Sequence, residues 1–519
     1  MDASRTAMAP LVLRVRRGCA RVEVGAQMTA SDVESTPSYG ARLAALARQR
    51  PDEVAVLFVE ESGAESPMTW AAFDRRSNQL ARALAAEGVG QDDTVAVGLR
   101  NSLEHLVTCF AAWKLGAVPV PMRWDLPEWE HRRVLDVVDP TFVVEGAHAA
   151  VLADAEAMSE LPLADAVSPN AWGVCSSGST GTPKVILTKF PAIHQPGSFN
   201  PVVEAWGAIR VDQRVLVPAP LYHTNGFTCI RTLLCGHPIV LMERFNAALV
   251  LDLVERHRIT GFIAATPFLL RLSRVEGIDD RDLSSLEWVQ QGAAPLPVWL
   301  GRRICELIGP EHFFLSYGAS EQHGLVIARG DEYLEHPGTL GRPMLDNDLK
   351  ILGEDGEELP AGEVGAIYMR TPVGPLATYK GAGVAPLTMT PDGFATVGDL
   401  GWVDADGFVF LADRRVDMIV TGGANVYPAE VESALSEHTG IADVVVIGLP
   451  DEEWGHRVHA LIQPVTADAL GEAEIIAFAK ERLAPYKAPK TVEFLEHIPR
   501  TEAMKVNRGA LVTERSEAT

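Results

Sequence analysis

Residues 176–184 carry the clearest chemical signal in the chain and read Ser-Ser-Gly-Ser-Thr-Gly-Thr-Pro-Lys. The two glycines permit backbone conformations in which amide N–H groups point at an anion, and the hydroxyls and the lysine add further donors and a positive charge. The spacing differs from the common P-loop, in which lysine directly follows the second glycine. Because apolar runs that predict strands precede and follow it, we interpret this segment as a phosphate-binding loop and not as a Ser/Gly linker.

Three other segments offer groups that could act on a nucleotide. Residues 317–321, Tyr-Gly-Ala-Ser-Glu, provide an aromatic face, a hydroxyl and a carboxylate of the kind that Mg²⁺ prefers. Asp399 lies in a turn with glycines at 398 and 401, a shape suited to a ribose diol, although a lone Asp in a turn usually caps it. Lys505 ends the polar run Pro499–Lys505 and by itself would be a solvated surface charge.

The bulk properties exclude several classes of protein. The chain has 519 residues, of which 47% are hydrophobic and 22% charged, as in a globular protein of more than one domain. A net charge of −24 argues against nucleic acid or an anionic membrane as the main partner. The six cysteines form no C-x-x-C pair, which favours reduced thiols and a cytoplasmic location. No apolar run is long enough for an integral membrane segment, and the sequence leaves the oligomeric state open.

Short apolar strands alternate with amphipathic helices from about residue 40, which predicts α/β layers with helix-covered sheets. Predicted strands lie at 54–59, 94–97, 215–217, 262–265, 286–289 and 313–315. One predicted helix ends near residue 88, and two others cover 103–115 and 248–257. Residues 349–411 are rich in Gly, Asp and Pro between short strands, as in a β-rich subdomain. Beyond residue 417 a new pattern of strands and helices predicts a small α+β domain.

We therefore predict a large N-terminal domain over residues 36–413, a hinge over 414–417 and a small mobile C-terminal domain over 417–519. Residues 1–35 are expected to be a disordered extension, because the first 27 are basic and lack both a signal-peptide core and the Ser content of a transit peptide.

Taken together, the motifs resemble the adenylate-forming superfamily, which includes acyl-CoA synthetases, peptide-synthetase adenylation domains and firefly-type luciferases. The phosphate loop is followed in order by Tyr-Gly-x-Ser-Glu, Gly-Asp, Asp-Arg-x-x-Asp, Gly-Gly-x-Asn-x-Tyr-Pro-x-Glu and Pro-Arg-Thr-x-x-x-Lys. The resemblance covers residues 40 to 511.

The resemblance implies a role for each matching residue, with ATP, Mg²⁺ and CoA as the small molecules bound. The triphosphate would be held by Ser176, Ser177, Gly178, Ser179, Thr180, Gly181, Thr182 and Lys184. The adenine would be lined by Gly292, Ala293, Ala294 and Pro295, with Tyr317 and Gly318 on its other side. Ser320 would contact the α-phosphate, Glu321 and Thr180 would bind Mg²⁺, and Asp399 and Arg414 would hold the ribose. Lys505 would contact the carboxylate and the α-phosphate, His223 would line the acyl pocket, and Gly422, Gly423 and Ala424 would line a pantetheine tunnel.

Several positions depart from the family pattern. Val416 stands where the hinge residue is often Asp or Lys, and a β-branched residue there could slow rotation of the C-terminal domain. Met504 stands where Gly usually precedes the lysine, which could stiffen that loop. Val185, Ser320 and His456 are milder departures, and none removes a charge that adenylation needs.

The implied activity is that of an acid–CoA ligase, which activates a carboxylic acid as its acyl-adenylate and passes it to CoA. A stand-alone amide synthetase is the alternative, because it would need the same residues. The segment Leu221–Phe227 lacks the acidic residue that pairs with an α-amine, so a free amino acid is disfavoured. A nucleotide-binding regulator without turnover would predict loss of Glu321 or Lys505, and no residue argues for a luciferase-like oxidation. His223, Asn225 and Phe227 hint at an aromatic, cyclic or medium-chain acid.

Overall fold

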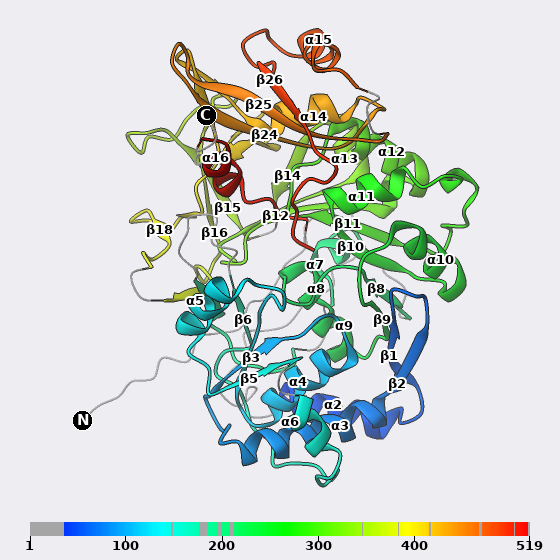
Figure 1. Ribbon diagram of the computed structural model, residues 1–519. Helices are drawn as coiled ribbons and strands as arrows, with labels where there is room; N and C mark the ends of the chain where they lie inside the picture. Colours follow the sequence, from blue (N-terminus) through cyan, green and yellow to red (C-terminus); the bar gives the residue numbers. More distant parts are fainter. Residues whose placement is uncertain are drawn as a thin grey trace.

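The computed structural model describes residues 36–146, 149–175, 184–195, 199–207, 212–344, 346–381, 384–414, 417–466, 470–502 and 504–516. Figure 1 shows a large N-terminal body, coloured blue to yellow, with a smaller orange and red domain above it. This arrangement confirms the predicted α/β fold with a larger N-terminal and a smaller C-terminal domain.

A parallel run of strands forms the centre of the N-terminal domain and belongs to a 15-stranded sheet. Its members, in spatial order, are β12 (Phe313–Gly318), β11 (Trp288–Gly292), β10 (Gly261–Ala265), β8 (Val215–Val217), β9 (Ile239–Met242) and β1 (Val54–Val59). β2 (Glu65–Thr69) pairs antiparallel with β1 at one edge. Strands such as β8, β9 and β11 are buried along their whole length, as expected where helices cover both faces of a parallel sheet.

Two hydrophobic clusters lie on opposite faces of this sheet. Along β8, Val215 and Val217 belong to one cluster and Leu216 to the other, as the alternation of strand side chains requires. The first cluster includes residues of α2 (Tyr39–Gln49), α3 (Trp70–Ala86), α4 (Leu103–Lys114) and α9 (Cys229–Leu234). The second includes residues of α10 (Ala247–His257), α11 (Thr266–Ser273), α12 (Val298–Ile308) and α13 (Gly330–Glu335).

Smaller sheets and a β-rich region complete the N-terminal domain. β3 (Thr94–Gly98) pairs in parallel with β4 (Val118–Pro121) and β5 (Phe142–Glu145), near α5 (Glu128–Val138) and α6 (Ala149–Ala155). β7 (Val185–Thr188) pairs antiparallel with β6 (Gly173–Cys175) and β17 (Ala377–Lys380). The β-rich region contains β13 (Leu325–Arg329), β14 (Thr339–Pro343), β15 (Asp348–Leu352), β16 (Gly365–Arg370), β18 (Thr388–Met389), β19 (Ala395–Thr396), β20 (Asp399–Val403) and β21 (Val409–Arg414). Two short helices flank β8 in the chain: α7 (Pro201–Glu204) precedes it and α8 (Thr224–Phe227) follows it.

The C-terminal domain has its own five-stranded sheet and its own hydrophobic cores. The sheet contains β22 (Ile419–Thr421), β23 (Ala424–Val426), β24 (Ile441–Asp451), β25 (Gly455–Pro464) and β26 (Thr491–Phe494). Its helices are α14 (Pro428–Ser436), α15 (Glu472–Arg482) and α16 (Arg508–Ser516).

The strand predicted at 286–289 is shifted, since β11 begins at Trp288. The reason is a turn, in which the Leu286 amide donates to the Leu283 carbonyl.

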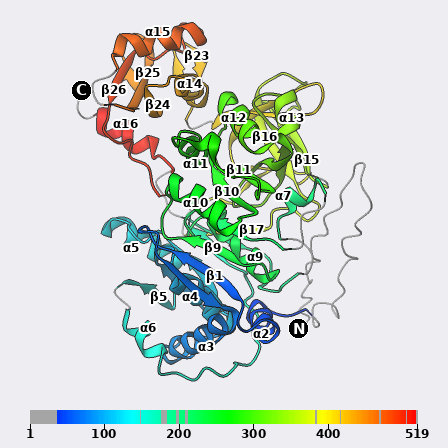
Figure 2. The same ribbon diagram turned by 90° about the vertical axis from the view of Figure 1, so that its right-hand side faces the viewer.

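Polar contacts join the two domains at the side of the N-terminal domain formed by α11 and α12 (Figure 2). The Arg274 guanidinium donates to the Ala442 carbonyl at 2.7 Å. The Trp299 indole N–H donates to the Ser436 hydroxyl at 3.0 Å. These contacts hold β24 and the end of α14 against the helices that cover the central sheet.

Of the helices in the described part of the chain, none combines the length and the hydropathy required to cross a membrane.

Candidate active site

The carboxyl ends of the central parallel strands meet at one edge of the sheet, which is where open α/β sheets bind ligands. Residues 292–295 end β11 and begin the loop that follows it, and Tyr317 and Gly318 end the neighbouring β12. Ala293 has a φ of 70°, so the chain turns sharply after the strand. The side-chain amide of Gln291 stabilises this turn, because its Nε2 donates to the Ala294 carbonyl at 2.6 Å. Gly292, the first of the four residues expected to line the adenine, therefore lies beside the end of β12, where Tyr317 is.

Glu321 and Lys184 form a partly buried ion pair at this edge. The Lys184 Nζ lies 3.2 Å from the Glu321 Oε1, and Glu321 is 8% exposed. Tyr379 completes the group, since its hydroxyl donates to the same carboxylate oxygen at 2.7 Å. The Lys184 Nζ also lies 3.8 Å from the centre of the Tyr379 ring. Strand pairing explains the arrangement, because Tyr379 of β17 lies opposite Ile186 of β7. Lys184 is two residues from Ile186, so it lies on the same face of the sheet as Tyr379.

The Glu321 carboxylate is held in its charged form. Burial alone would raise its pKa, but the hydrogen bond from Tyr379 and the charge of Lys184 together lower the pKa below its ordinary value. An ionised carboxylate oxygen next to a cationic side chain is the donor type that suits Mg²⁺ shared with a polyphosphate. The residues present therefore fit a magnesium ion here, with Glu321 as its protein ligand.

Asp399 and Tyr317 are connected directly. The Tyr317 hydroxyl donates to the Asp399 Oδ2 at 2.8 Å, and Asp399 is buried. The register of β20 and β21 places Asp399 opposite Arg414 in the backbone ladder. The residues expected to stack on the base and to hold the ribose are thus joined by one hydrogen bond.

His223 immediately precedes α8, which follows β8 at the same edge of the sheet. Gly226 fixes this loop, because a β carbon there would lie 2.2 Å from the Pro220 carbonyl oxygen. The His223 ring packs against Tyr222, with centroids 4.6 Å apart. Burial, and to a lesser extent the nearby charges of Lys505 and Arg123, lower the pKa of His223 to about 3, so the imidazole is neutral.

Ser320 is joined to the same helix. Its hydroxyl lies 3.0 Å from the Thr224 hydroxyl, which links the Tyr-Gly-Ala-Ser-Glu segment to the His223 loop. Phe227 lies away from this edge, because it is buried in the first hydrophobic cluster and its ring lies 5.8 Å from that of Trp172. This side chain is therefore part of the core.

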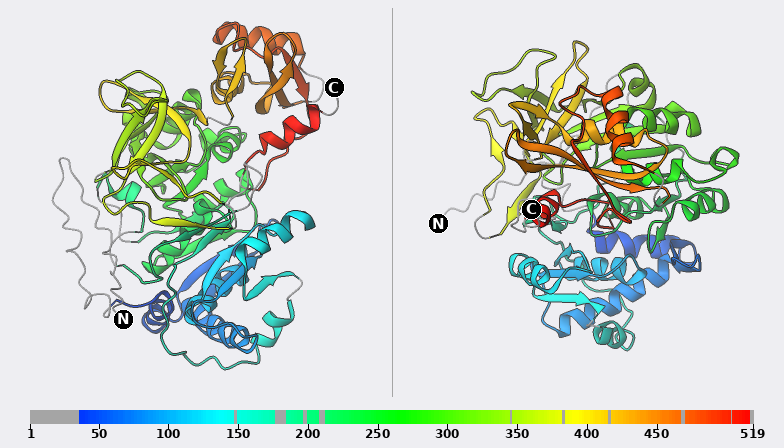
Figure 3. Two further views of the ribbon diagram at one scale, coloured as in Figure 1. Left: turned by 90° about the vertical axis from the view of Figure 1, so that its left-hand side faces the viewer. Right: turned by 45° about the horizontal axis from the view of Figure 1, so that its top comes forward.

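Lys505 reaches the N-terminal domain on a loop of the C-terminal domain, drawn in red in Figure 3. Glu502 of this loop accepts a hydrogen bond from the Trp124 indole at 3.1 Å. Arg500 ties the base of the loop to its own domain through two hydrogen bonds to Asp443, at 2.6 and 2.8 Å. Lys505 is close enough to lower the pKa of His223, so the loop carries its charge to the edge where the other candidate residues gather.

The contacts of Gly422 and Gly423 are within the C-terminal domain and do not join these glycines to the edge where the other candidate residues lie. They form the turn between β22 and β23, with φ values of 57° and 81°. The Gly422 amide donates to the Trp454 carbonyl at 2.9 Å, and a β carbon on Gly422 would lie 2.5 Å from the Trp454 ring. Only glycine fits there, both in conformation and in space.

Some predicted site residues lie outside the described residues. These are Ser176, Ser177, Gly178, Ser179, Thr180, Gly181 and Thr182 of the phosphate loop, the hinge residue Val416 and the side chain of Arg414.

Tyr379, Thr224 and His323 are site residues that the sequence did not indicate. His323 is 1% exposed, and its Nδ1 has no hydrogen-bond partner within the described residues. Burial lowers the pKa of this histidine in spite of the charges of Glu321 and Asp399. Tyr379 could not be found because its role depends on the pairing of two strands far apart in the chain.

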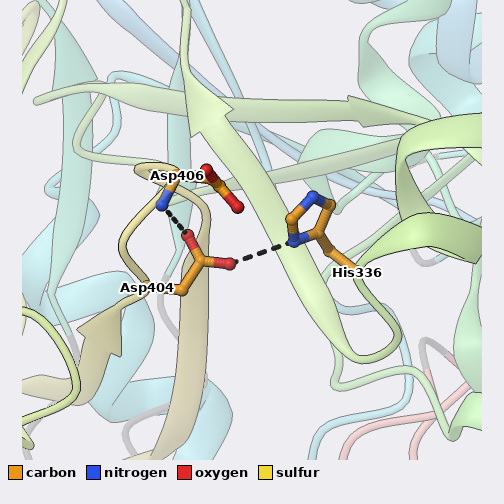
Figure 4. A group of neighbouring side chains, drawn as sticks. All are labelled: His336, Asp404 and Asp406. Atoms are coloured by element: carbon orange, nitrogen blue, oxygen red, sulfur yellow. Dashed lines mark hydrogen bonds and ion pairs between the residues drawn. The ribbon is translucent and has the colours of Figure 1, made fainter.

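His336, Asp404 and Asp406 bring metal-ligand types of atom within 4.8 Å of one another, as Figure 4 shows. Hydrogen bonds within a turn account for this group. The Asp404 carboxylate accepts from the Asp406 amide at 3.0 Å, from the Phe408 amide at 2.9 Å and pairs with the His336 Nδ1 at 3.0 Å. We assign it a structural role in the β20–β21 hairpin.

Two family models match the chain. That of the AMP-binding enzymes covers residues 43–379, and that of the AMP-binding enzyme C-terminal domain covers residues 430–505. A feruloyl-CoA synthase from Amycolatopsis sp is 33% identical over 462 residues, which cover 85% of this chain and 93% of that protein. An indoleacetate–CoA ligase from Aromatoleum aromaticum is 30% identical over 499 residues, covering 88% and 94%.

The fold agrees with these sequence relationships. The o-succinylbenzoate CoA synthetase of Bacillus subtilis, solved in complex with its acyl-adenylate intermediate, matches with a TM-score of 0.77 at 28% identity, over 92% of this chain and 98% of that one. The site and the fold define an adenylate-forming enzyme. The chain belongs to the AMP-binding enzyme family, as a ligase of the acyl-CoA synthetase type.

Proposed function

We propose that this enzyme is an ATP-dependent acid–CoA ligase that activates a carboxylic acid as its acyl-adenylate and then transfers the acyl group to the CoA thiol. The observation that carries the proposal is the convergence of two lysines on one edge of the sheet. Lys184 is paired with Glu321, and Lys505, on the loop of the other domain that Glu502 joins to Trp124, lowers the pKa of His223 by its charge.

ATP would bind across the carboxyl ends of the central strands. The phosphate loop and Lys184 would hold the β- and γ-phosphates, residues 292–295 and Tyr317 would enclose the base, and Asp399 would accept hydrogen bonds from the ribose. A magnesium ion on Glu321, and on Thr180 of the phosphate loop, would neutralise part of the triphosphate charge. A related synthetase from Bacillus subtilis was solved with ATP and a magnesium ion, which supports this assignment.

In the first step a carboxylate oxygen forms a bond to the α-phosphorus as the bond to pyrophosphate breaks. Two anions must approach, at a cost of about 4 kcal/mol for one unit-charge pair at 4 Å with an effective dielectric constant near 20. Lys505 would offset this repulsion by lying between the carboxylate and the α-phosphate, and Ser320 would donate to the same phosphate. Because His223 is neutral, it would line the acid pocket without adding charge.

In the second step the thiol sulfur forms a bond to the acyl carbon as the bond to AMP breaks, and the thiol proton leaves to solvent or to a base. The C-terminal domain would rotate between the steps about residues 414–417 and bring Gly422 and Gly423 to the pantetheine arm. We propose the domain boundaries predicted from the sequence for this motion.

The relatives favour CoA over an amine as the acceptor, because the feruloyl, indoleacetate and succinylbenzoate enzymes are all named as CoA ligases or synthases. Their named acids each contain an aromatic ring, so we propose an aromatic or arylalkyl acid as the substrate class.

A panel of aromatic, cyclic, medium-chain and long-chain acids tests this proposal. Each acid is incubated with ATP and Mg²⁺, and pyrophosphate release is measured with CoA, with an amine, or with neither. We expect acid-dependent release, and a thioester with AMP only when CoA is present. A product formed only with the amine would establish the amide synthetase instead, and preference for long-chain acids would exclude the proposed substrate class.

Replacing Tyr379 with phenylalanine should reduce pyrophosphate release about tenfold, because a hydrogen bond to a buried carboxylate is lost. The ring that contacts Lys184 remains, so the effect should be an increased Mg²⁺ requirement and not a loss of folding. Tyr486→Phe, at an exposed tyrosine of the C-terminal domain, is the matched control. An unchanged Mg²⁺ dependence in Tyr379→Phe would contradict the role of this tyrosine.

The pH dependence should show no ionisation of His223 in the working range. With a pKa of about 3, His223 binds a proton only below pH 4, so His223→Gln and the native enzyme should have parallel rate profiles between pH 6 and 9. Steady-state rates of pyrophosphate release across this range provide the measurement. A step near pH 6.5 that disappears in His223→Gln would show that this imidazole titrates.

A further inference from the structure

We propose that Met504 is a positioning residue, which seats in the hydrophobic core of the N-terminal domain and thereby holds Lys505 at the active site. The proposal rests on the function assigned above to Lys505. It concerns what favours the orientation of the C-terminal domain in which that lysine is presented.

The loop before Lys505 is a closed, hydrogen-bonded turn. The Met504 amide donates to the Thr501 carbonyl at 2.7 Å, and the Thr501 amide donates to the Lys505 carbonyl at 2.9 Å. The Arg500 guanidinium donates to the Met504 carbonyl at 3.0 Å, and through its pair with Asp443 it fixes this carbonyl to β24. A displacement of Met504 is therefore passed directly to Lys505.

The backbone of Met504 is in a conformation that disfavours its side chain. Its φ is 62°, in the left-handed region that glycine adopts without steric cost and in which other residues are strained. The family pattern has glycine at this position, so methionine must be retained by something that its side chain does.

The side chain is buried in the other domain. Met504 is 8% exposed and belongs to the second hydrophobic cluster, whose other buried members in the described chain all lie between Val59 and Tyr333. The cores of the C-terminal domain are separate clusters that do not contain it. The Met504 side chain, which belongs to the C-terminal domain, thus packs in the same apolar cluster as buried residues of α10, α11 and α12.

This contact can exist in only one of the two domain orientations. Rotation of the C-terminal domain withdraws Met504 from the cluster and exposes it to water, while its backbone gains freedom to leave the left-handed region. Burial of Met504 therefore favours the orientation that presents Lys505, and glycine at this position would favour neither.

Three substitutions separate this role from a simple effect on folding. Met504→Gly removes the apolar anchor and relieves the backbone, and Met504→Gln keeps the length but places an amide where the thioether was. Met504→Leu keeps an apolar group. Single-turnover pyrophosphate release is measured without CoA, thioester formation is measured from preformed acyl-adenylate with CoA, and thermal unfolding is followed by circular dichroism.

We expect adenylation to fall about tenfold in both Met504→Gly and Met504→Gln and to stay within about threefold of the native rate in Met504→Leu. In Met504→Gly and Met504→Gln, the KM for ATP should not fall. The rate of thioester formation from preformed acyl-adenylate should not fall either. Equal adenylation rates in all four proteins, or a parallel loss of both half-reactions with a lowered unfolding temperature, would overturn the proposal. Lys505→Ala serves as the reference, because an active Lys505→Ala enzyme would refute the role of Lys505 itself.

Discussion

Replacing Lys505 with alanine is expected to lower the rate of acid-dependent pyrophosphate release by about a hundredfold or more. The reason is that its ammonium group would offset the repulsion between the carboxylate and the α-phosphate. The loss should appear in the maximal rate, since in the proposed function Lys184 and the phosphate loop would hold the triphosphate.

Lys480→Ala provides the matched control, because Lys480 lies exposed on α15 of the same domain. This variant should retain the native rate. If Lys505→Ala released pyrophosphate as fast as Lys480→Ala, the adenylation role of Lys505 would be wrong.

Replacing Glu321 with glutamine should reduce adenylation on the order of a hundredfold, because a neutral amide is a poor ligand for Mg²⁺ and the metal carries much of the charge stabilisation. The variant also removes the counter-charge of Lys184, which lies 3.2 Å from the Glu321 carboxylate. We expect the Mg²⁺ concentration for half-maximal rate to rise strongly, and titration of Mg²⁺ at fixed ATP and acid measures it.

Glu276→Gln, at an exposed position, is the control for the loss of one negative charge. A Glu321→Gln enzyme with the native Mg²⁺ requirement would show that the metal is bound elsewhere, whatever its rate. A variant that loses activity but keeps its unfolding temperature would place the effect in the site.

Local patterns predicted most of the fold, because continuous apolar runs and helical stripes report burial directly. The strands at 54–59 and 215–217 have the predicted bounds, and the helix predicted over 103–115 is α4. Exact ends were harder where a turn competes with a strand, as at Leu286. The partners of each strand were not predictable, since pairing between distant strands depends on the whole chain.

The same limit applies to the site. Motifs identified Lys184, Glu321 and Lys505, because each lies in a short segment with a distinctive order of residues. Tyr379 and the Tyr317–Asp399 hydrogen bond depend on tertiary pairing, so no local pattern indicates them.

Apart from Met504, the C-terminal domain has hydrophobic cores of its own, and hydrogen bonds such as those of Arg274 and Trp299 join it to the N-terminal domain. An interface of this kind resembles a transient complex between two proteins more than the interior of one. In the proposed cycle the C-terminal domain would therefore act as a tethered subunit, which docks and undocks while the packing of its own core is preserved. Crowding, viscosity and ionic strength should then act on turnover through the rate of this docking, as they act on the association of separate molecules.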